Sequence, residues 1–112
     1  MKVQLHTDRH VVVDAGLVAR IEANVEDQLG RFERLTRVEV HLTDQSGGKR
    51  LGADVRCLIE ARAAGLRPVA VTHAAPTAAD ALDGSVEKLA TLLGHTFDRL
   101  EDRGARETIR GR

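Results

Sequence analysis

The chain is poor in aromatic residues and in cysteine. It has no Trp or Tyr, only two Phe and a single Cys among 112 residues. The lone Cys57 excludes an internal disulfide, and no neighbouring cysteine completes a structural zinc site. With so few aromatic side chains, the hydrophobic core must be built from Val, Leu, Ile and Ala. The length suits one folded domain rather than two.

An excess of charge and a long hydrophobic run are also missing. The 17 Lys and Arg residues balance 17 Asp and Glu residues, so the chain lacks the strongly basic composition usual in nucleic-acid-binding proteins. No apolar segment approaches the roughly 18 residues of a membrane span, and the amino terminus lacks the pattern of a signal peptide. We therefore expect a cytoplasmic protein that does not bind membranes.

Hydrophobic periodicity predicts a strand and a helix in the first third of the chain. Residues 2–6 alternate between apolar and polar, as in a half-buried strand. Asp14 stands where a helix N-cap is expected, and apolar residues then recur at helical spacing. This pattern predicts an amphipathic helix that ends near Leu35.

Three strands and a second helix are predicted in the remainder. Segments 36–44 and 53–62 alternate on either side of the glycine-rich stretch 45–49, which predicts a hairpin. A further strand spans residues 66–73, and Pro68 places it at an edge of the sheet or makes it begin after the proline. Thr77 and Asp80 resemble a capping box at the start of the longest helical pattern. That pattern fades after Arg103.

The predicted order is β-α-β-β-β-α, an α+β domain. If the first two strands pair in parallel, the intervening helix must make a right-handed crossover. We expect a four-stranded sheet with both helices on one face. The expected domain covers residues 1–103, and residues 104–112 form an expected flexible basic carboxy-terminal tail.

Two stretches within this order carry a family resemblance. They are Phe32-Glu33-Arg34-Leu35 leading into Val38-Glu39-Val40-His41-Leu42, and Ala81-Leu82-Asp83-Gly84-Ser85-Val86-Glu87-Lys88-Leu89. The chain resembles the ribosome hibernation-promoting factor and ribosome-associated inhibitor family, in its short form. The resemblance runs over nearly the whole chain.

The resemblance implies a partner and a role. It implies binding to the small ribosomal subunit, on 16S-type ribosomal RNA near the decoding region, and silencing of translation in resting or stressed cells. It implies no catalysis, no cofactor and no small-molecule substrate, and a monomer or weak dimer. The alternative is a non-catalytic regulatory or protein-interaction module that has kept the fold and lost ribosome affinity, which the zero net charge favours.

On both predicted helices, basic and acidic residues fall on different sides, although the net charge of the whole chain is zero. At about 100° per residue, Lys88, His95 and Arg99 fall on one stripe of the second helix, with acidic residues on another. Basic residues also follow one side of the first apolar stripe. Arginine can hold a phosphate through two N–H groups. A solvated helix face is the competing interpretation. The candidate RNA-binding residues are Lys88, His95, Arg99, Arg20, Arg31, Arg34, Arg103 and Arg106.

Other kinds of site have little support. His6 and His10 are not aligned by a helix, and His41, His73 and His95 lie on separate elements, so no metal site is predicted. Segment 43–49 lacks the first glycine of a phosphate-binding loop. Cys57 shares a strand face with Val55 and Ile59, which predicts a buried, inert thiol. Asp83 lies in the second turn of its helix, where a carboxylate suits the helix dipole, so its role is expected to be structural. No enzymatic constellation is evident.

Overall fold

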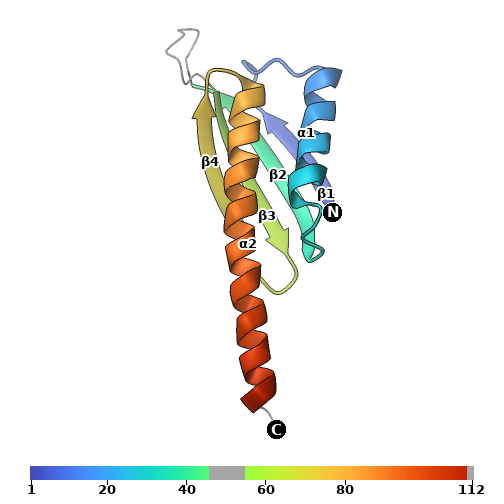
Figure 1. The fold of residues 1–112 in the computed structure, drawn as a ribbon. Coiled ribbons are helices and arrows are strands. Elements are labelled where there is room, and N and C mark those ends of the chain that lie inside the picture. Colours follow the sequence, from blue (N-terminus) through green and yellow to red (C-terminus); the bar gives the residue numbers. More distant parts are fainter. Residues whose placement is uncertain (46–54, 111–112) are drawn as a thin grey trace.

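The element order matches the prediction. The computed structural model describes the backbone of residues 1–45 and 55–110, and the side chains of residues 1–45 and 55–100. Six elements follow one another along the chain (Figure 1). They are β1 (Lys2–Thr7), α1 (Ala15–Leu29), β2 (Leu35–Asp44), β3 (Val55–Ala63), β4 (Val69–Ala75) and α2 (Ala78–Arg110). The glycine-rich connection lies outside the described residues apart from Gln45.

The four strands form one mixed sheet in the order β1-β2-β3-β4. β1 pairs with β2 in parallel, which requires the crossover through α1, and the other neighbours are antiparallel. β4 is an edge strand that begins directly after Pro68. Proline has no N–H to donate to a ladder, so this placement costs no sheet hydrogen bond. The prediction for the fourth strand is confirmed.

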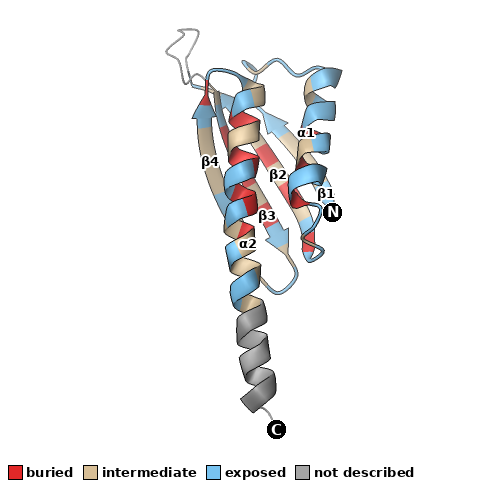
Figure 2. Cartoon of the chain, viewed as in Figure 1, coloured by how far each residue is buried: buried red, intermediate tan, exposed pale blue. Residues whose placement is uncertain are grey.

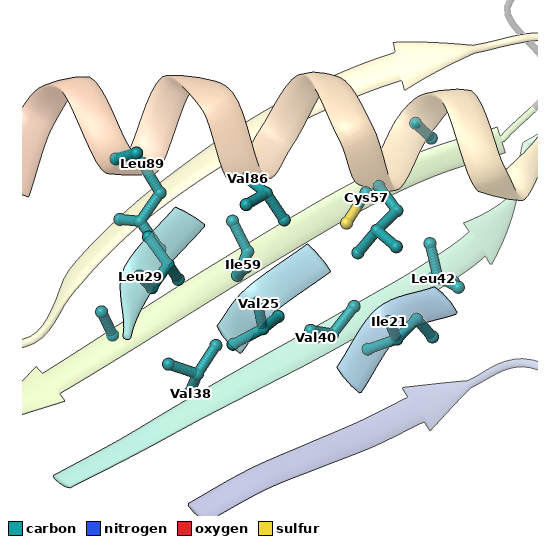
Figure 3. Close-up of a cluster of buried hydrophobic side chains, with 14 of the residues drawn as sticks. Ile21, Val25, Leu29, Val38, Val40, Leu42, Cys57, Ile59, Val86 and Leu89 are labelled. Atoms are coloured by element: carbon teal, nitrogen blue, oxygen red, sulfur yellow. The ribbon is translucent and has the colours of Figure 1, made fainter. Parts of the chain in front are cut away.

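Both helices cover the same face of the sheet, as predicted (Figure 1). The side of α2 that faces the strands is buried, while its outer side is exposed (Figure 2). The core lies between these layers and contains aliphatic side chains from both helices and the two central strands (Figure 3). Fully buried members include Ile21, Val25, Leu29, Val38, Val40, Leu42, Cys57, Ile59, Leu82, Val86, Leu89 and Leu93.

Both predicted helix starts are confirmed. The Asp14 carboxylate accepts a hydrogen bond from the backbone N–H of Leu17 at 2.8 Å. The Thr77 hydroxyl accepts one from the backbone N–H of Asp80 at 3.1 Å. Each bond satisfies an N–H group that has no partner within its helix, which is why these residue types begin helices.

The end of the first helix was predicted wrongly. α1 ends at Leu29, not near Leu35, and Leu35 is already the first residue of β2, opposite Ala63. A turn follows Gly30, in which the N–H of Phe32 donates to Leu29 and that of Leu35 donates to Phe32. Phe32 in this connection packs against the core, and Leu35 at the start of β2 belongs to it. Because these two apolar residues continue the helical spacing, the sequence pattern extends past the actual end of α1 at Leu29.

The second helix is longer than its hydrophobic pattern. It has 33 residues and continues to Arg110, through most of the segment expected to be a tail. Residues 103–107 contain Arg, Ala and Glu, which favour helix, and the single Gly104 costs only about 1 kcal/mol relative to Ala. The division into a domain and a flexible tail stays a prediction. No helix in the described part of the chain combines the length and apolarity needed to cross a membrane.

Candidate nucleic-acid interface

Arg20 on α1 is held by an acidic residue of α2. Its Nη2 atom lies 2.6 Å from Oδ2 of Asp83, and Nδ2 of Asn24 donates to Oδ1 of the same carboxylate at 2.7 Å. The hydrogen bond with Asp83 raises the pKa of the Arg20 guanidinium, as does the negative charge of that carboxylate. Asp83, predicted to be structural, therefore joins the two helices. A phosphate group at Arg20 would compete with this ion pair.

Lys88 lies on the exposed side of α2 and leans towards the sheet edge. Its Nζ donates to the backbone oxygen of Thr72 in β4 at 3.2 Å. Edge strands present backbone groups that have no ladder partner on one side. Lys88 as a residue is exposed to solvent although its Nζ has this hydrogen-bond partner.

Arg31 and Arg34 belong to the connection between α1 and β2 rather than to the helix on which they were predicted. The guanidinium of Arg31 lies over the Phe32 ring, 4.6 Å from its centroid. That of Arg34 lies 5.7 Å from the centroid of Phe97 and donates to the backbone oxygen of Ala64 at 3.0 Å. The two Phe rings stack at 5.5 Å. This basic-aromatic cluster, composed of Arg31, Phe32, Arg34 and Phe97, ties the connection to α2.

His95 joins this cluster from α2. It lines one hollow together with Arg31 and Phe32. Gly94 also lines this hollow, where a Cβ would make ordinary contact with Nη2 of Arg31 at 3.8 Å. Arg99 is exposed one turn further along α2. The side chains of Arg103 and Arg106 lie outside the described residues.

The groove between the upper parts of the helices has the opposite character. Asp27 of α1 and Asp83 and Glu87 of α2 line it, together with Arg20 and Asn24. Carboxylates predominate in the groove between the helices. Arg31, Arg34 and His95 gather around the basic-aromatic cluster, where Glu33 and Asp98 line the same hollows. On the outer side of α2, the exposed Lys88 and Arg99 alternate with the exposed Asp80, Glu87 and Asp98. A polyanion would be repelled by the groove between the helices and could pair with the guanidinium groups of the basic-aromatic cluster.

The sheet face opposite the helices carries polar side chains centred on Glu39. Its Oε1 lies 3.1 Å from Nε2 of His6 and 3.6 Å from Nη2 of Arg37, and its Oε2 lies 3.7 Å from Nη2 of Arg62. Burial acts to raise the pKa of Glu39, but the Arg37 guanidinium, the His6 hydrogen bond and Arg62 together hold it below its usual value. Glu39 is therefore ionised at neutral pH.

His6 and His41 stack on this face. Their ring centroids lie 4.6 Å apart and the ring planes are 12° from parallel. Sequence reasoning treated the two residues as members of separate elements. The elements are separate, but the parallel register sets His6 directly opposite His41. The signal available in the sequence was the alternation of both strands, which places these residues on the same sheet face once the strands pair.

The sequence matches a protein-family model, and the fold is similar to those of solved structures. A family model described as sigma 54 modulation protein / S30EA ribosomal protein matches residues 6–101. The structure is similar to that of the Thermus thermophilus Protein Y N-terminal domain, with a TM-score of 0.68, 19% sequence identity, and coverage of 86% of this chain and 99% of that one.

A second solved structure has the same TM-score. It is a ribosomal subunit interface protein from Coxiella burnetii, with a TM-score of 0.68, 13% identity, and coverage of 88% of this chain and 99% of that one. No curated protein sequence matches the chain.

Proposed function

Because the chain belongs to the sigma 54 modulation protein / S30EA ribosomal protein family, we propose that it is a non-catalytic, ribosome-associated factor that silences translation. The family match over residues 6–101 is the observation that carries this proposal. The proposed partner is the small subunit, through its ribosomal RNA near the decoding region. The similar structures named as Protein Y and as a ribosomal subunit interface protein support the ribosome as partner.

The proposed contact surface is the outer side of α2 with the basic-aromatic cluster. Lys88, His95 and Arg99 are exposed there, and Arg31 lies beside His95. The two Phe rings are covered by arginines and packed against the core, so they are poorly placed to stack on unpaired bases. Recognition of phosphates and of the shape of folded RNA fits this surface better than recognition of single-stranded bases.

Sedimentation with small subunits tests the proposal. Wild-type protein should move with the small subunit on a sucrose gradient at low salt and leave it as salt rises, because phosphate contacts release counterions. The double variant Lys88→Glu, Arg99→Glu should bind more weakly and with a shallower salt dependence. The log-log slope should fall by roughly one unit for each basic residue removed.

A charge-matched control lies on the other face. Lys2 and Arg56 are exposed, and both belong to the sheet face opposite the helices. The variant Lys2→Glu, Arg56→Glu changes the net charge by the same amount and should sediment like the wild type. If the control loses binding and the α2 variant keeps it, the contact surface is assigned to the wrong face.

A second candidate function follows from the acidic groove. Arg20 is engaged by Asp83, and Asp27 and Glu87 add negative charge beside it. These features favour a regulatory module that has kept the fold without ribosome affinity. A wild-type protein that stays at the top of the gradient even at low salt would overturn the ribosomal proposal in favour of this one.

A further inference from the structure

The sheet face opposite the helices carries a cluster that the proposed ribosome contact does not use. Among the residues that the structure describes, His6, Glu39 and His41 are the one group of three whose potential metal-ligand atoms all lie within 4.8 Å of one another. They come from two adjacent strands, since His6 is on β1 and the other two are on β2. The sheet itself fixes their spacing, because the parallel ladder sets the register of the two strands.

The strand geometry brings the three side chains together. Residues two apart on a strand point to the same face, so Glu39 and His41 project together from β2. His6 stands opposite His41 and diagonal to Glu39. Its Nε2 lies 3.1 Å from the Glu39 carboxylate. Two ligands bound to one zinc ion at bond lengths of about 2.0–2.1 Å in tetrahedral geometry are separated by about 3.3 Å.

We infer that this cluster is a binding site for one first-row transition-metal cation, with Zn²⁺ as the expected ion. Two imidazoles and one carboxylate are a donor set that zinc takes in proteins, and three protein ligands leave a fourth position open to water. Mg²⁺ and Ca²⁺ prefer oxygen ligands, so a site with two imidazole nitrogens does not favour them. The inference does not depend on the ribosomal proposal, because it rests on other residues and another face.

Binding requires a small movement of the imidazole rings. The stacked rings are nearly parallel, whereas ligand nitrogens must point at a common centre. Rotation about the last torsion of a histidine is soft, because this torsion has broad minima. The His6 side chain is 48% exposed, which leaves room for its ring to turn on the solvent side, while the Glu39 side chain is only 14% exposed. The hydrogen bond between them would be replaced by two bonds to the metal.

The two arginines beside Glu39 oppose the binding of a cation. Arg37 and Arg62 lie 3.6 and 3.7 Å from its carboxylate oxygens, and their charges repel a dication. Arg62 also donates to Glu60 at 2.9 Å. Removing the Arg62 charge should tighten metal binding because a positive charge beside Glu39 is lost, whereas removing either histidine should weaken binding because a ligand is lost. Opposite effects of the arginine and histidine substitutions on metal affinity distinguish a specific metal site from nonspecific binding of metal to surface histidines.

Calorimetric titration of the full chain with Zn²⁺ tests the inference. The wild type should bind one ion, and His6→Ala and His41→Ala should each weaken binding by at least about tenfold, since even outer-shell changes cost that much. Arg62→Gln should bind more tightly than the wild type. Mg²⁺ should give no binding heat. Long-range ¹⁵N spectra of the histidine rings should show that Zn²⁺ shifts His6 and His41.

His10→Ala provides the matched control, because His10 is exposed and near in sequence but is not one of the three residues. It should bind Zn²⁺ like the wild type. Circular dichroism and a urea midpoint for each variant separate lost binding from lost folding. The inference is overturned if Zn²⁺ does not bind the folded wild type, or if binding survives in folded His6→Ala and His41→Ala.

Discussion

Gly84 of α2 lies directly against the imidazole ring of His73 in β4. A Cβ at position 84 would stand 2.1 Å from Cδ2 and 2.3 Å from Nε2 of that ring. No side chain fits at this distance without movement of the helix or the ring. The glycine thus sets how closely α2 approaches the edge strand, which in turn positions Lys88 one turn later over Thr72.

Replacing Gly84 by Ala should destabilise the protein by about 1–3 kcal/mol, as overpacking does, despite the better helix propensity of Ala. Gly94→Ala is the matched control on the same helix, because a Cβ there meets only Nη2 of Arg31 at 3.8 Å. The control should be neutral or more stable by up to about 1 kcal/mol. Urea unfolding of both variants measures the difference. Equal midpoints for the two variants would contradict the close packing at His73.

Leu89 occupies the centre of the buried side of α2. It is fully buried, so truncation leaves a cavity between the helix and the sheet. Leu89→Ala should lower the free energy of unfolding by about 2–5 kcal/mol. Val18→Ala, at a position 36% exposed on α1, should change it far less. An unchanged urea midpoint for Leu89→Ala would show that α2 does not pack as described.

Cys57 should resist thiol reagents in the folded state. The side chain is fully buried, and its sulfur lies 3.0 Å from the Ser85 hydroxyl. Burial raises the pKa of the Cys57 thiol, and the hydrogen bond with Ser85 opposes that rise. The reactive thiolate is therefore scarcer than in an exposed cysteine. Labelling at pH 8 should be slow in the native protein and fast in urea. Rapid stoichiometric labelling without urea would place this strand face towards solvent.

Asp8 links the end of β1 to the end of β2. Its carboxylate accepts hydrogen bonds from the backbone N–H groups of Asp44 at 2.9 Å, His10 at 3.0 Å and Val11 at 3.2 Å. The bond from Asp44 is the main cause that lowers the pKa of Asp8; burial opposes it, and the bonds from His10 and Val11 add to the lowering. The Asp8 carboxylate therefore binds a proton more readily in the unfolded chain than in the folded one.

The stability from Asp8 should be complete above the ordinary aspartate pKa of about 3.9 and should disappear as pH falls through the lowered value. Asp8→Asn should therefore be less stable than the wild type at pH 7, and the gap should narrow at pH 3. Urea midpoints of both proteins at the two pH values measure it. An equal difference in stability between the two proteins at pH 7 and pH 3 would mean that the charge of the Asp8 carboxylate does not contribute to stability.

Local patterns predicted the elements and their faces well, because each depends on residues close in sequence. Asp14 and Thr77 begin helices through bonds made three residues later, and Cys57 follows the alternation of its own strand. The end of α1 was missed because Phe32 is buried by contact with Phe97, 65 positions away in the chain. Burial imposed by a distant element imitates the pattern of a helix.

The candidate sites depended more strongly on distant partners. Lys88, His95 and Arg99 could be assigned to one helical face from their spacing. The engagement of Arg20 by Asp83 required knowledge of how the helices pack. The cluster of His6, Glu39 and His41 required the register of β1 on β2, which no residue near the strands encodes alone.

The parallel pairing of β1 with β2 has a consequence for the order of folding. β3 and β4 are joined by a short turn at Gly65, whose positive φ of 79° suits glycine, so this hairpin closes over a small loop. The pairing of β1 with β2 encloses α1, and closing that larger loop costs more chain entropy. Substitutions in the β3–β4 hairpin should chiefly slow folding, whereas Val3→Ala in β1 should chiefly speed unfolding. Stopped-flow measurements of the folding and unfolding rates test this prediction. If Val3→Ala chiefly slowed folding, β1 would already be in place in the folding transition state.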